Sequence, residues 1–273
     1  MLETKIAAPA PSADWRDYLV DEQWTRFTRA DHATWDRLYA RQVALLADKV
    51  VSPFLAGLKR LGLHEPGVPR LERLSERLHH ATGWRLVAVA GIVPDAAFFA
   101  MLRDRVFPIG NFIRDGGNLD YLEEPDCFHD IFGHVPVLAH EPMARLMEEL
   151  GRLGVTACAN GDTDIISRIY WHTVEFGLAR EDGETKIWGA GLASSFGEAQ
   201  FSLDADVPRP RFTVDDAAAT PYRSDRFQPL YFVSDSLEAS SDALAALTPA
   251  RLASLGDGQG RGYSAEDERL AAV

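Results

Sequence analysis

The chain has 273 residues, of which 46% are hydrophobic and 25% charged, and these values fit a globular protein rather than a disordered or membrane-embedded one. Its net charge of −13 argues against nucleic acid and anionic membranes as partners, because both would require a basic face. No apolar run approaches the ~20 residues that span a bilayer and no signal peptide is visible, so we expect a cytoplasmic protein.

Apolar residues recur at helical spacing along most of the chain. The first expected helical region covers residues 31–61, where Pro53 marks a break or kink. Gly83 ends the second expected helix, because glycine tolerates a left-handed cap. The expected helices after the first region are 70–80, 95–104, 126–132, 142–154, 164–179, 195–202 and 236–246. The expected strands are 84–89, 211–214 and 229–233.

No internal repeat or linker divides this pattern, and helices outnumber the scattered strands. We therefore predict a single domain over residues 15–250, mostly α with a small β element. The small, Pro-rich residues 1–14 are typical of a flexible tail, and residues 251–273 are expected to form a mobile C-terminal tail.

Two histidines, His129 and His134, lie five residues apart. On an ideal α-helix this spacing separates two side chains by about 140°, so that both could not reach one metal ion. Gly133 and Pro136 are helix terminators, and we expect the helix to end near Gly133 and His134 to turn inward. The spacing would then allow chelation, although an isolated histidine pair is more often structural.

Glu175 lies in the predicted helix 164–179, where apolar side chains on nearly every side indicate burial. An unpaired carboxylate there costs several kcal/mol, so Glu175 must be paired, protonated or bound to a cation. Arg168, nearly on the same helix face, is one candidate partner. A metal ion shared with the two histidines is the other.

Two histidines and one carboxylate leave open positions on ferrous iron for oxygen and a co-substrate. The same ligand set serves zinc hydrolases, so the residue types alone allow both kinds of enzyme. Zinc hydrolases of the H-E-x-x-H type place a glutamate base beside the first histidine. Asp130 and the four-residue gap fit that pattern poorly.

Four longer segments extend the pattern, and together they resemble the catalytic domain of the pterin-dependent aromatic amino acid hydroxylases. They are EPDCFHDIFGHVP at 124–136, YWHTVEFGL at 170–178, GAGLASSFGE at 189–198 and FQPLYF at 227–232. The resemblance covers residues 24–237, and its motifs are long, ordered and specific.

The resemblance implies a catalytic centre in which iron(II) is held by His129, His134 and Glu175. It implies a tetrahydropterin co-substrate, O2 and a free aromatic amino acid as substrate. Substrate contacts are implied for Arg114, Pro125, Trp171, Phe176, Gly191 and Ser194. Pterin contacts are implied for Val89, Gly91, Ile92, Val93, Phe98, Asp130 and Tyr170.

Several of these residues also have simpler interpretations. From the sequence alone, Arg114 would be a surface arginine paired with Asp115, whereas the resemblance gives it the substrate carboxylate, which suits a planar guanidinium. Trp171, Phe176 and Phe98 could simply pack in the core. Ser194 resembles a family residue beside the iron that could orient a ligand imidazole.

The chain departs from the family's larger members, which carry a long N-terminal domain and a C-terminal coiled coil. After Leu247 it is too short and Gly-rich for such a coil, so we expect a minimal bacterial-type member and a monomer. Asp130 stands where many relatives have glutamate. Ser224 falls near a position that is acidic in tyrosine hydroxylases, which favours phenylalanine, although Asp225 adjoins it.

The expected function is conversion of phenylalanine to tyrosine, the first step of phenylalanine catabolism. A tyrosine or tryptophan hydroxylase and a zinc metallohydrolase stay open as alternatives. A non-catalytic protein that binds pterin or amino acid would be expected to have lost a ligand or Arg114, and neither is lost.

Overall fold

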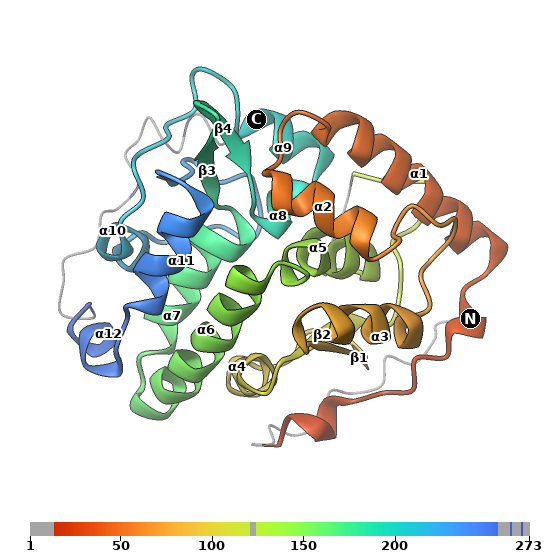
Figure 1. The fold of residues 1–273 in the computed structure, drawn as a ribbon, viewed down its shortest axis with the longest axis horizontal. Coiled ribbons are helices and arrows are strands. Elements are labelled where there is room, and N and C mark those ends of the chain that lie inside the picture. Colours follow the sequence, from red (N-terminus) through yellow and green to blue (C-terminus); the bar gives the residue numbers. More distant parts are fainter. Residues whose placement is uncertain (1–13, 121–123, 256–262, 264–268, 270–273) are drawn as a thin grey trace.

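The computed structural model describes residues 14–120, 124–255, 263 and 269, and within them the chain is mostly helical with two small sheets (Figure 1). The expected fold class is confirmed. The predicted flexible tail 1–14 lies outside the described residues, except for Asp14, which caps the 3₁₀ helix η1 (Trp15–Tyr18). Among the described helices, none is both long and apolar enough to cross a bilayer.

The predicted helical region 31–61 forms two helices, α1 (Arg29–Leu46) and α2 (Ser52–Arg60), after the short 3₁₀ helix η2 (Trp24–Arg26). A reciprocal capping box starts α1: the Thr28 hydroxyl accepts from the Asp31 N–H at 3.2 Å, and the Asp31 carboxylate accepts from the Thr28 N–H at 2.7 Å. Pro53 lies in the first turn of α2, where its missing N–H would be unpaired anyway. The break therefore precedes the proline.

The helix α3 (Leu71–Thr82) comes next and leads into a parallel β-α-β unit of β1 (Arg85–Val89), α4 (Asp95–Arg103) and β2 (Val106–Gly110). Gly83 ends α3 with a φ of 78°, as expected. Strand β2 was not predicted, because Pro108 and Gly110 interrupt its β-pattern. All five of its residues are buried, as is usual for a parallel strand.

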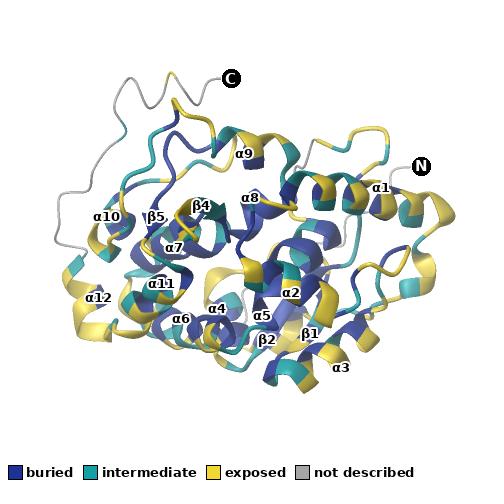
Figure 2. Cartoon of the chain, turned by 45° about the horizontal axis from the view of Figure 1, so that its top comes forward, coloured by how far each residue is buried: buried dark blue, intermediate teal, exposed yellow. Residues whose placement is uncertain are grey.

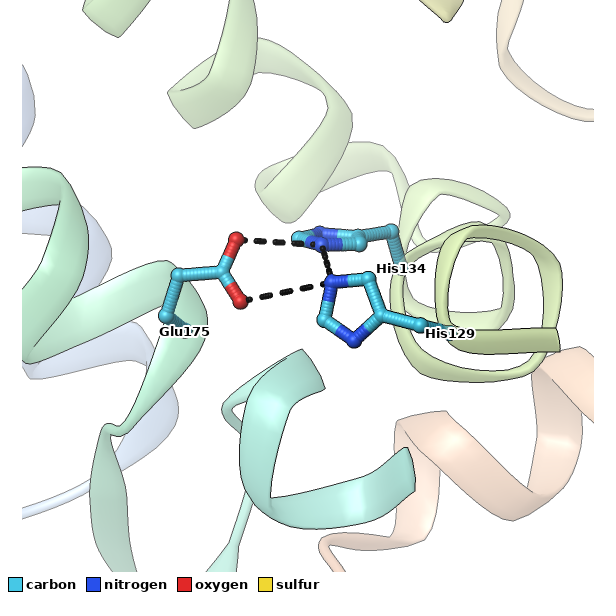
Figure 3. Close-up of side chains that lie close together, drawn as sticks. All are labelled: His129, His134 and Glu175. Atoms are coloured by element: carbon cyan, nitrogen blue, oxygen red, sulfur yellow. Dashed lines mark hydrogen bonds and ion pairs between the residues drawn. The ribbon is translucent and has the colours of Figure 1, made fainter. Parts of the chain in front are cut away.

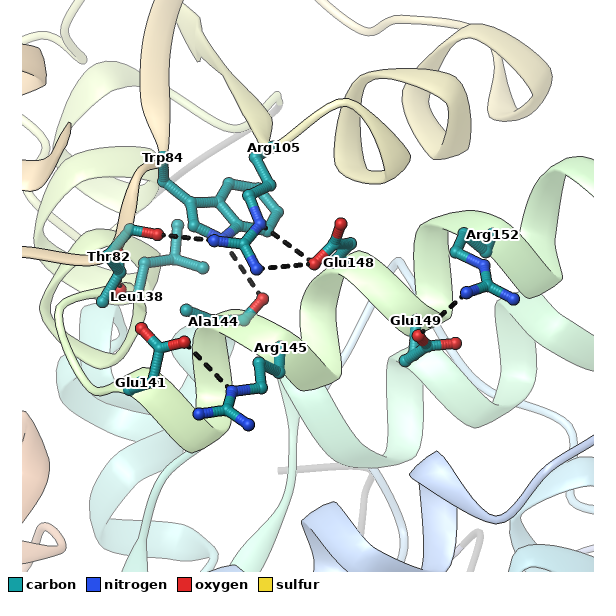
Figure 4. Close-up of polar contacts among 10 residues, drawn as sticks. All are labelled: Thr82, Trp84, Arg105, Leu138, Glu141, Ala144, Arg145, Glu148, Glu149 and Arg152. Carbon is teal, nitrogen blue, oxygen red and sulfur yellow. Dashed lines mark hydrogen bonds and ion pairs between the residues drawn. The ribbon is translucent and has the colours of Figure 1, made fainter.

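Polar contacts fix this unit on the long helix α6 (Glu141–Asn160) (Figure 4). Arg105 donates from Nε and Nη2 to one carboxylate oxygen of Glu148, at 2.9 and 2.8 Å, and from Nη1 to the Thr82 carbonyl at 2.9 Å. The Trp84 indole donates to the Ala144 carbonyl at 3.1 Å. The ends of α3 and β2 are thereby tied to α6.

Two helices that carry the histidines and Glu175 contain π-helical turns. The segment η3 (His129–His134) runs into α5 (Val135–Leu138), and α7 (Thr163–Tyr170) runs into η4 (Trp171–Glu175). The prediction that the first helix ends near Gly133 is wrong. Gly133 serves close packing instead, because a Cβ there would lie 2.7 Å from the Ala190 carbonyl oxygen.

A second sheet has the order β4-β3-β5, from β3 (Leu178–Glu181), β4 (Glu184–Ile187) and β5 (Val233–Ser234). The predicted helix 164–179 was therefore too long, because an apolar run alone cannot distinguish a buried helix from a buried strand. The predicted strands 211–214 and 229–233 shrink to β5 and to a single bridge between Arg211 and Val233.

The remaining helices are α8 (Ala190–Ser194), α9 (Phe196–Phe201), α10 (Val214–Ala219), α11 (Leu237–Ala245) and α12 (Pro249–Leu255). The predicted domain boundary at residue 250 falls inside α12. Leu252 of this helix packs into the core, with 1% of its surface exposed. Most of the predicted tail 251–273 lies outside the described residues. Buried residues gather around α5, α7 and α8, and α12 presents an exposed outer face (Figure 2).

Candidate functional site

The structure brings His129, His134 and Glu175 together from η3 and η4 (Figure 3). His134 Nε2 lies 3.1 Å from Glu175 Oε1 and 3.2 Å from His129 Nε2, and His129 Nε2 lies 3.7 Å from Glu175 Oε2. One potential ligand atom of each residue lies within 4.8 Å of the others. Two imidazole nitrogens and a carboxylate converging in this way form a candidate centre for a divalent metal ion.

The π-helical turn explains how two histidines five residues apart can face one point. A π-helix closes its backbone hydrogen bonds over five residues instead of four, so residues i and i+5 lie much closer to one face than they do on an α-helix. His129 and His134 occupy the two ends of η3. Both histidines reach one site as predicted, but a widened helix rather than the expected helix end is responsible.

The alternative partner for Glu175, Arg168, does not contact it. The Arg168 guanidinium points to the Ala218 carbonyl at 3.4 Å. Glu175 is only 12% exposed and has the two imidazoles as its neighbours. The interpretation of a simple Arg168–Glu175 ion pair is therefore wrong.

Ser194 fixes the orientation of the His129 ring. Its hydroxyl donates to the Ala190 carbonyl at 2.9 Å and lies 2.8 Å from His129 Nδ1. Because the single hydroxyl hydrogen is used on Ala190, Nδ1 must carry the proton that closes the contact with Ser194. His129 Nε2 is then left with a free lone pair toward Glu175, as a metal ligand requires.

The surroundings of His129 and Glu175 favour the charge states that suit binding of a cation. Burial lowers the pKa of His129 to about 4, so its imidazole is neutral at pH 7. Burial alone would raise the pKa of Glu175, but the adjacent His134 and His129 bring it below its ordinary value. Burial raises the pKa of Asp130 to about 7, although its carboxylate accepts the Gly110 N–H at 2.7 Å.

Arg114 is buried and paired with Asp126, so the expectation of a surface arginine paired with Asp115 is wrong. Arg114 Nε and Nη2 donate to the two oxygens of Asp126 at 2.8 and 2.9 Å, and Nη1 donates to the Leu119 carbonyl at 3.1 Å. Asp126 also accepts the His129 N–H at 2.9 Å. Burial opposes its ionisation, but the Arg114 guanidinium holds the pKa of Asp126 below its ordinary value.

A cavity of about 240 Å³ opens beside the three candidate ligands. Its walls include every residue for which pterin contact was predicted, together with Pro125 and Trp171 from the predicted substrate contacts. Phe98 meets the ring of Tyr170 edge-on, with centroids 5.4 Å apart, and both rings line the cavity. A flat heterocycle whose faces stack on aromatic rings and whose edge forms hydrogen bonds, such as a pterin, fits walls of this composition.

Four residues with predicted substrate contacts do not line this cavity, namely Arg114, Phe176, Gly191 and Ser194. Phe176 packs on Trp171, with ring centroids 5.0 Å apart. Gly191 allows Phe176 and Glu175 to pack close to α8, because a Cβ there would lie 2.9 Å from the Phe176 ring. These residues support the cavity wall and the ligand side chains in the structure.

Three polar residues of the cavity were missed by the sequence analysis, namely Asp95, Ser167 and Tyr222. Asp95 and Ser167 precede Phe98 and Tyr170 by one helical turn, so i, i+3 spacing could have revealed them. Tyr222 lies in an irregular segment and stacks on Trp171, with centroids 4.3 Å apart and 20° between the planes. No local sequence pattern predicts that contact.

Comparisons with known proteins agree with this geometry. Residues 20–250 match the family model of the biopterin-dependent aromatic amino acid hydroxylases. The chain is 47% identical over 228 residues to a phenylalanine-4-hydroxylase of Ralstonia nicotianae, covering 83% of this chain and 73% of the relative. It is 37% identical over 222 residues to tyrosine 3-monooxygenase of Mus musculus, covering 80% of this chain and 44% of the relative.

A solved structure shows the same fold. Phenylalanine hydroxylase from Chromobacterium violaceum, with bound oxidised Fe(III), superimposes with a TM-score of 0.85 at 42% identity. The match covers 90% of each chain.

Proposed function

Because the chain belongs to the biopterin-dependent aromatic amino acid hydroxylases, we propose that it converts free phenylalanine and O2 to tyrosine with iron(II) and a tetrahydropterin. The observation that carries this proposal is the position of the His129, His134 and Glu175 cluster on the wall of a cavity lined by Phe98. A metal ion and a flat co-substrate can be adjacent there.

The donor set fits iron(II). Two imidazoles and one carboxylate leave other coordination positions open, and the Ser194 contact already directs one lone pair of His129 inward. His129, His134 and Glu175 would hold the metal. When bound, iron and tetrahydropterin together supply the redox chemistry that activates O2.

The protein's own contribution is binding, orientation and exclusion of water. Phe98 offers a ring face to the pterin, and the buried Tyr170 hydroxyl, which has no hydrogen-bond partner among the described residues, offers it a polar contact. Arg114 uses three of its five N–H groups on Asp126 and Leu119. Two donors remain, and we propose them for the substrate carboxylate, although Arg114 is not among the residues that line the cavity.

Phenylalanine is favoured over tyrosine because relatives named phenylalanine-4-hydroxylase reach 47% identity, whereas tyrosine 3-monooxygenase reaches 37%. The family assignment also disfavours a zinc hydrolase with the same ligands. We further propose a monomer that acts in the cytoplasm at the start of phenylalanine catabolism. The net charge of −13 supports the absence of nucleic acid and anionic membrane partners.

The ligand assignment is tested by Glu175→Ala and His134→Ala, with His64→Ala as the matched control because His64 is exposed. Both ligand variants should lose stoichiometric Fe(II) and hydroxylation, and the control should keep both. Full iron content and turnover in either ligand variant would contradict the assignment.

A further inference from the structure

The segment between α10 and β5 carries Tyr222 to the cavity, although its residues 220–228 form no helix or strand. Tyr222 stacks there on Trp171, and both rings line the cavity wall. An irregular segment holds such a position only if other groups replace the missing backbone hydrogen bonds.

Gln228 supplies two of these bonds. Its side-chain amide donates from Nε2 to the Arg223 carbonyl at 2.6 Å and accepts the Arg223 N–H on Oε1 at 3.0 Å. Arg223 directly follows Tyr222, and Gln228 is only 1% exposed. The side-chain amide therefore supplies the donor and acceptor that a neighbouring strand would supply, and it closes a hydrogen-bonded ring over residues 223–228, the amide ring.

Gln228 is itself fixed to α9. Its backbone N–H donates to Glu198 Oε1 at 2.9 Å, and the Tyr231 hydroxyl donates to the same oxygen at 2.8 Å. Glu198 is 7% exposed and belongs to α9. The amide ring is thus anchored to the protein core by a hydrogen bond to a buried carboxyl group.

The other end of the segment is held by His172, the residue after Trp171. Its Nε2 lies 3.0 Å from the Thr220 carbonyl oxygen and 3.2 Å from that of Pro221, and both contacts require His172 to donate. Burial lowers the pKa of His172 to about 4, so the ring is neutral. Tyr222 consequently lies between two fixed points.

We propose that Gln228 is a positioning residue that keeps Tyr222 stacked on Trp171 and thereby sets the side of the cavity where the amino acid is bound. The kinetic part of this inference rests on the proposed function. Without the amide ring, the segment opens, Tyr222 leaves Trp171 and the amino acid binds more weakly.

The first test does not depend on activity. Gln228→Met keeps the side-chain volume but removes both bonds to Arg223. Gln200→Met is the control, because the side-chain amide of the exposed Gln200 donates to the Phe196 carbonyl of its own helix, α9. Limited trypsin digestion is followed by mass spectrometry. Cleavage after Arg223 and after the exposed Arg226 should rise about tenfold in Gln228→Met, as expected for losing one to two hydrogen bonds, and cleavage at sites outside residues 220–228 should not change.

The second test is kinetic. Gln228→Met should raise the KM for phenylalanine about tenfold and change kcat by less than about twofold, as for lost ground-state binding. Tyr222→Ala should do the same, and the double variant should show no further rise, because both changes remove one interaction. Additive effects, or unchanged cleavage after Arg226, would overturn the proposal. If no variant or wild-type protein hydroxylated phenylalanine, the proposed function would fail while the trypsin result still decided the role of Gln228.

Discussion

Ser194→Ala isolates the contribution of a single hydroxyl group to the metal site. The hydroxyl is buried and bonds both His129 Nδ1 and the Ala190 carbonyl, so its loss leaves the imidazole free to rotate and to change tautomer. One hydrogen bond contributes about 0.5–1.5 kcal/mol, and losing a partner of a ligand histidine typically weakens metal binding 10–100-fold. We therefore expect Fe(II) to bind about tenfold more weakly.

Anaerobic competition between the protein and a coloured Fe(II) chelator measures this affinity. Ser202→Ala is the matched control, since Ser202 is equally buried and its hydroxyl also donates to a helix carbonyl, that of Ala199, away from the ligands. The control should bind Fe(II) like the wild type. If Ser194→Ala bound iron as tightly as Ser202→Ala, the argument that Ser194 orients His129 would be refuted.

Three further changes test other parts of the account. The pKa of Glu198 is raised by burial to about 7, so the native state holds its proton to higher pH than the unfolded chain, and stability is lost as pH rises through 7. Urea unfolding should show that the free energy of unfolding of Glu198→Gln falls by about 2–3 kcal/mol less between pH 5 and 8 than that of the wild type. The same pH dependence in both proteins would refute the burial argument. Gly154→Ala should lower the free energy of unfolding by about 1–3 kcal/mol, because its Cβ would lie 2.2 Å from the Phe99 ring; an unchanged urea midpoint would contradict this. Asp95→Asn removes a carboxylate from the wall of the cavity, one whose pKa is raised by burial and by Asp164. Loss of this charge should improve binding of the anionic tetrahydrofolate relative to the uncharged 6-methyltetrahydropterin by up to about fivefold in fluorescence titration. An unchanged affinity ratio would show that this charge does not reach the pterin.

The sequence predicted the residues of the candidate site better than the backbone that positions them. The positions of His129, His134 and Glu175 were found from ligand types and motif order, and the structure places them together. The π-helical turns could not be predicted, because they depend on tertiary packing rather than on residue periodicity. Gly133 was interpreted as a helix stop, but the contact that requires it lies on α8, far away in the sequence.

Long-range contacts account for the other differences. The partner of Arg114 proved to be Asp126 rather than its neighbour Asp115, since chain folding brings Asp126 back beside it. Tyr222 lies at the cavity because its ring stacks on Trp171 and because the Gln228 amide bonds the next residue, Arg223, and no local pattern encodes either contact. The long helices were located correctly, although the helix predicted at 142–154 ends six residues before the observed end of α6 at Asn160. The short helices α8, α10 and α12 were missed, because a few residues show no clear period.

The central claim is tested most directly by reconstituting the protein anaerobically with Fe(II), adding O2 and a tetrahydropterin, and supplying phenylalanine, tyrosine or tryptophan in parallel. Mass spectrometry then identifies any hydroxylated product. We predict that phenylalanine is converted to tyrosine and that the reaction requires both iron and the pterin. Absence of product from all three amino acids, with iron demonstrably bound, would contradict the account.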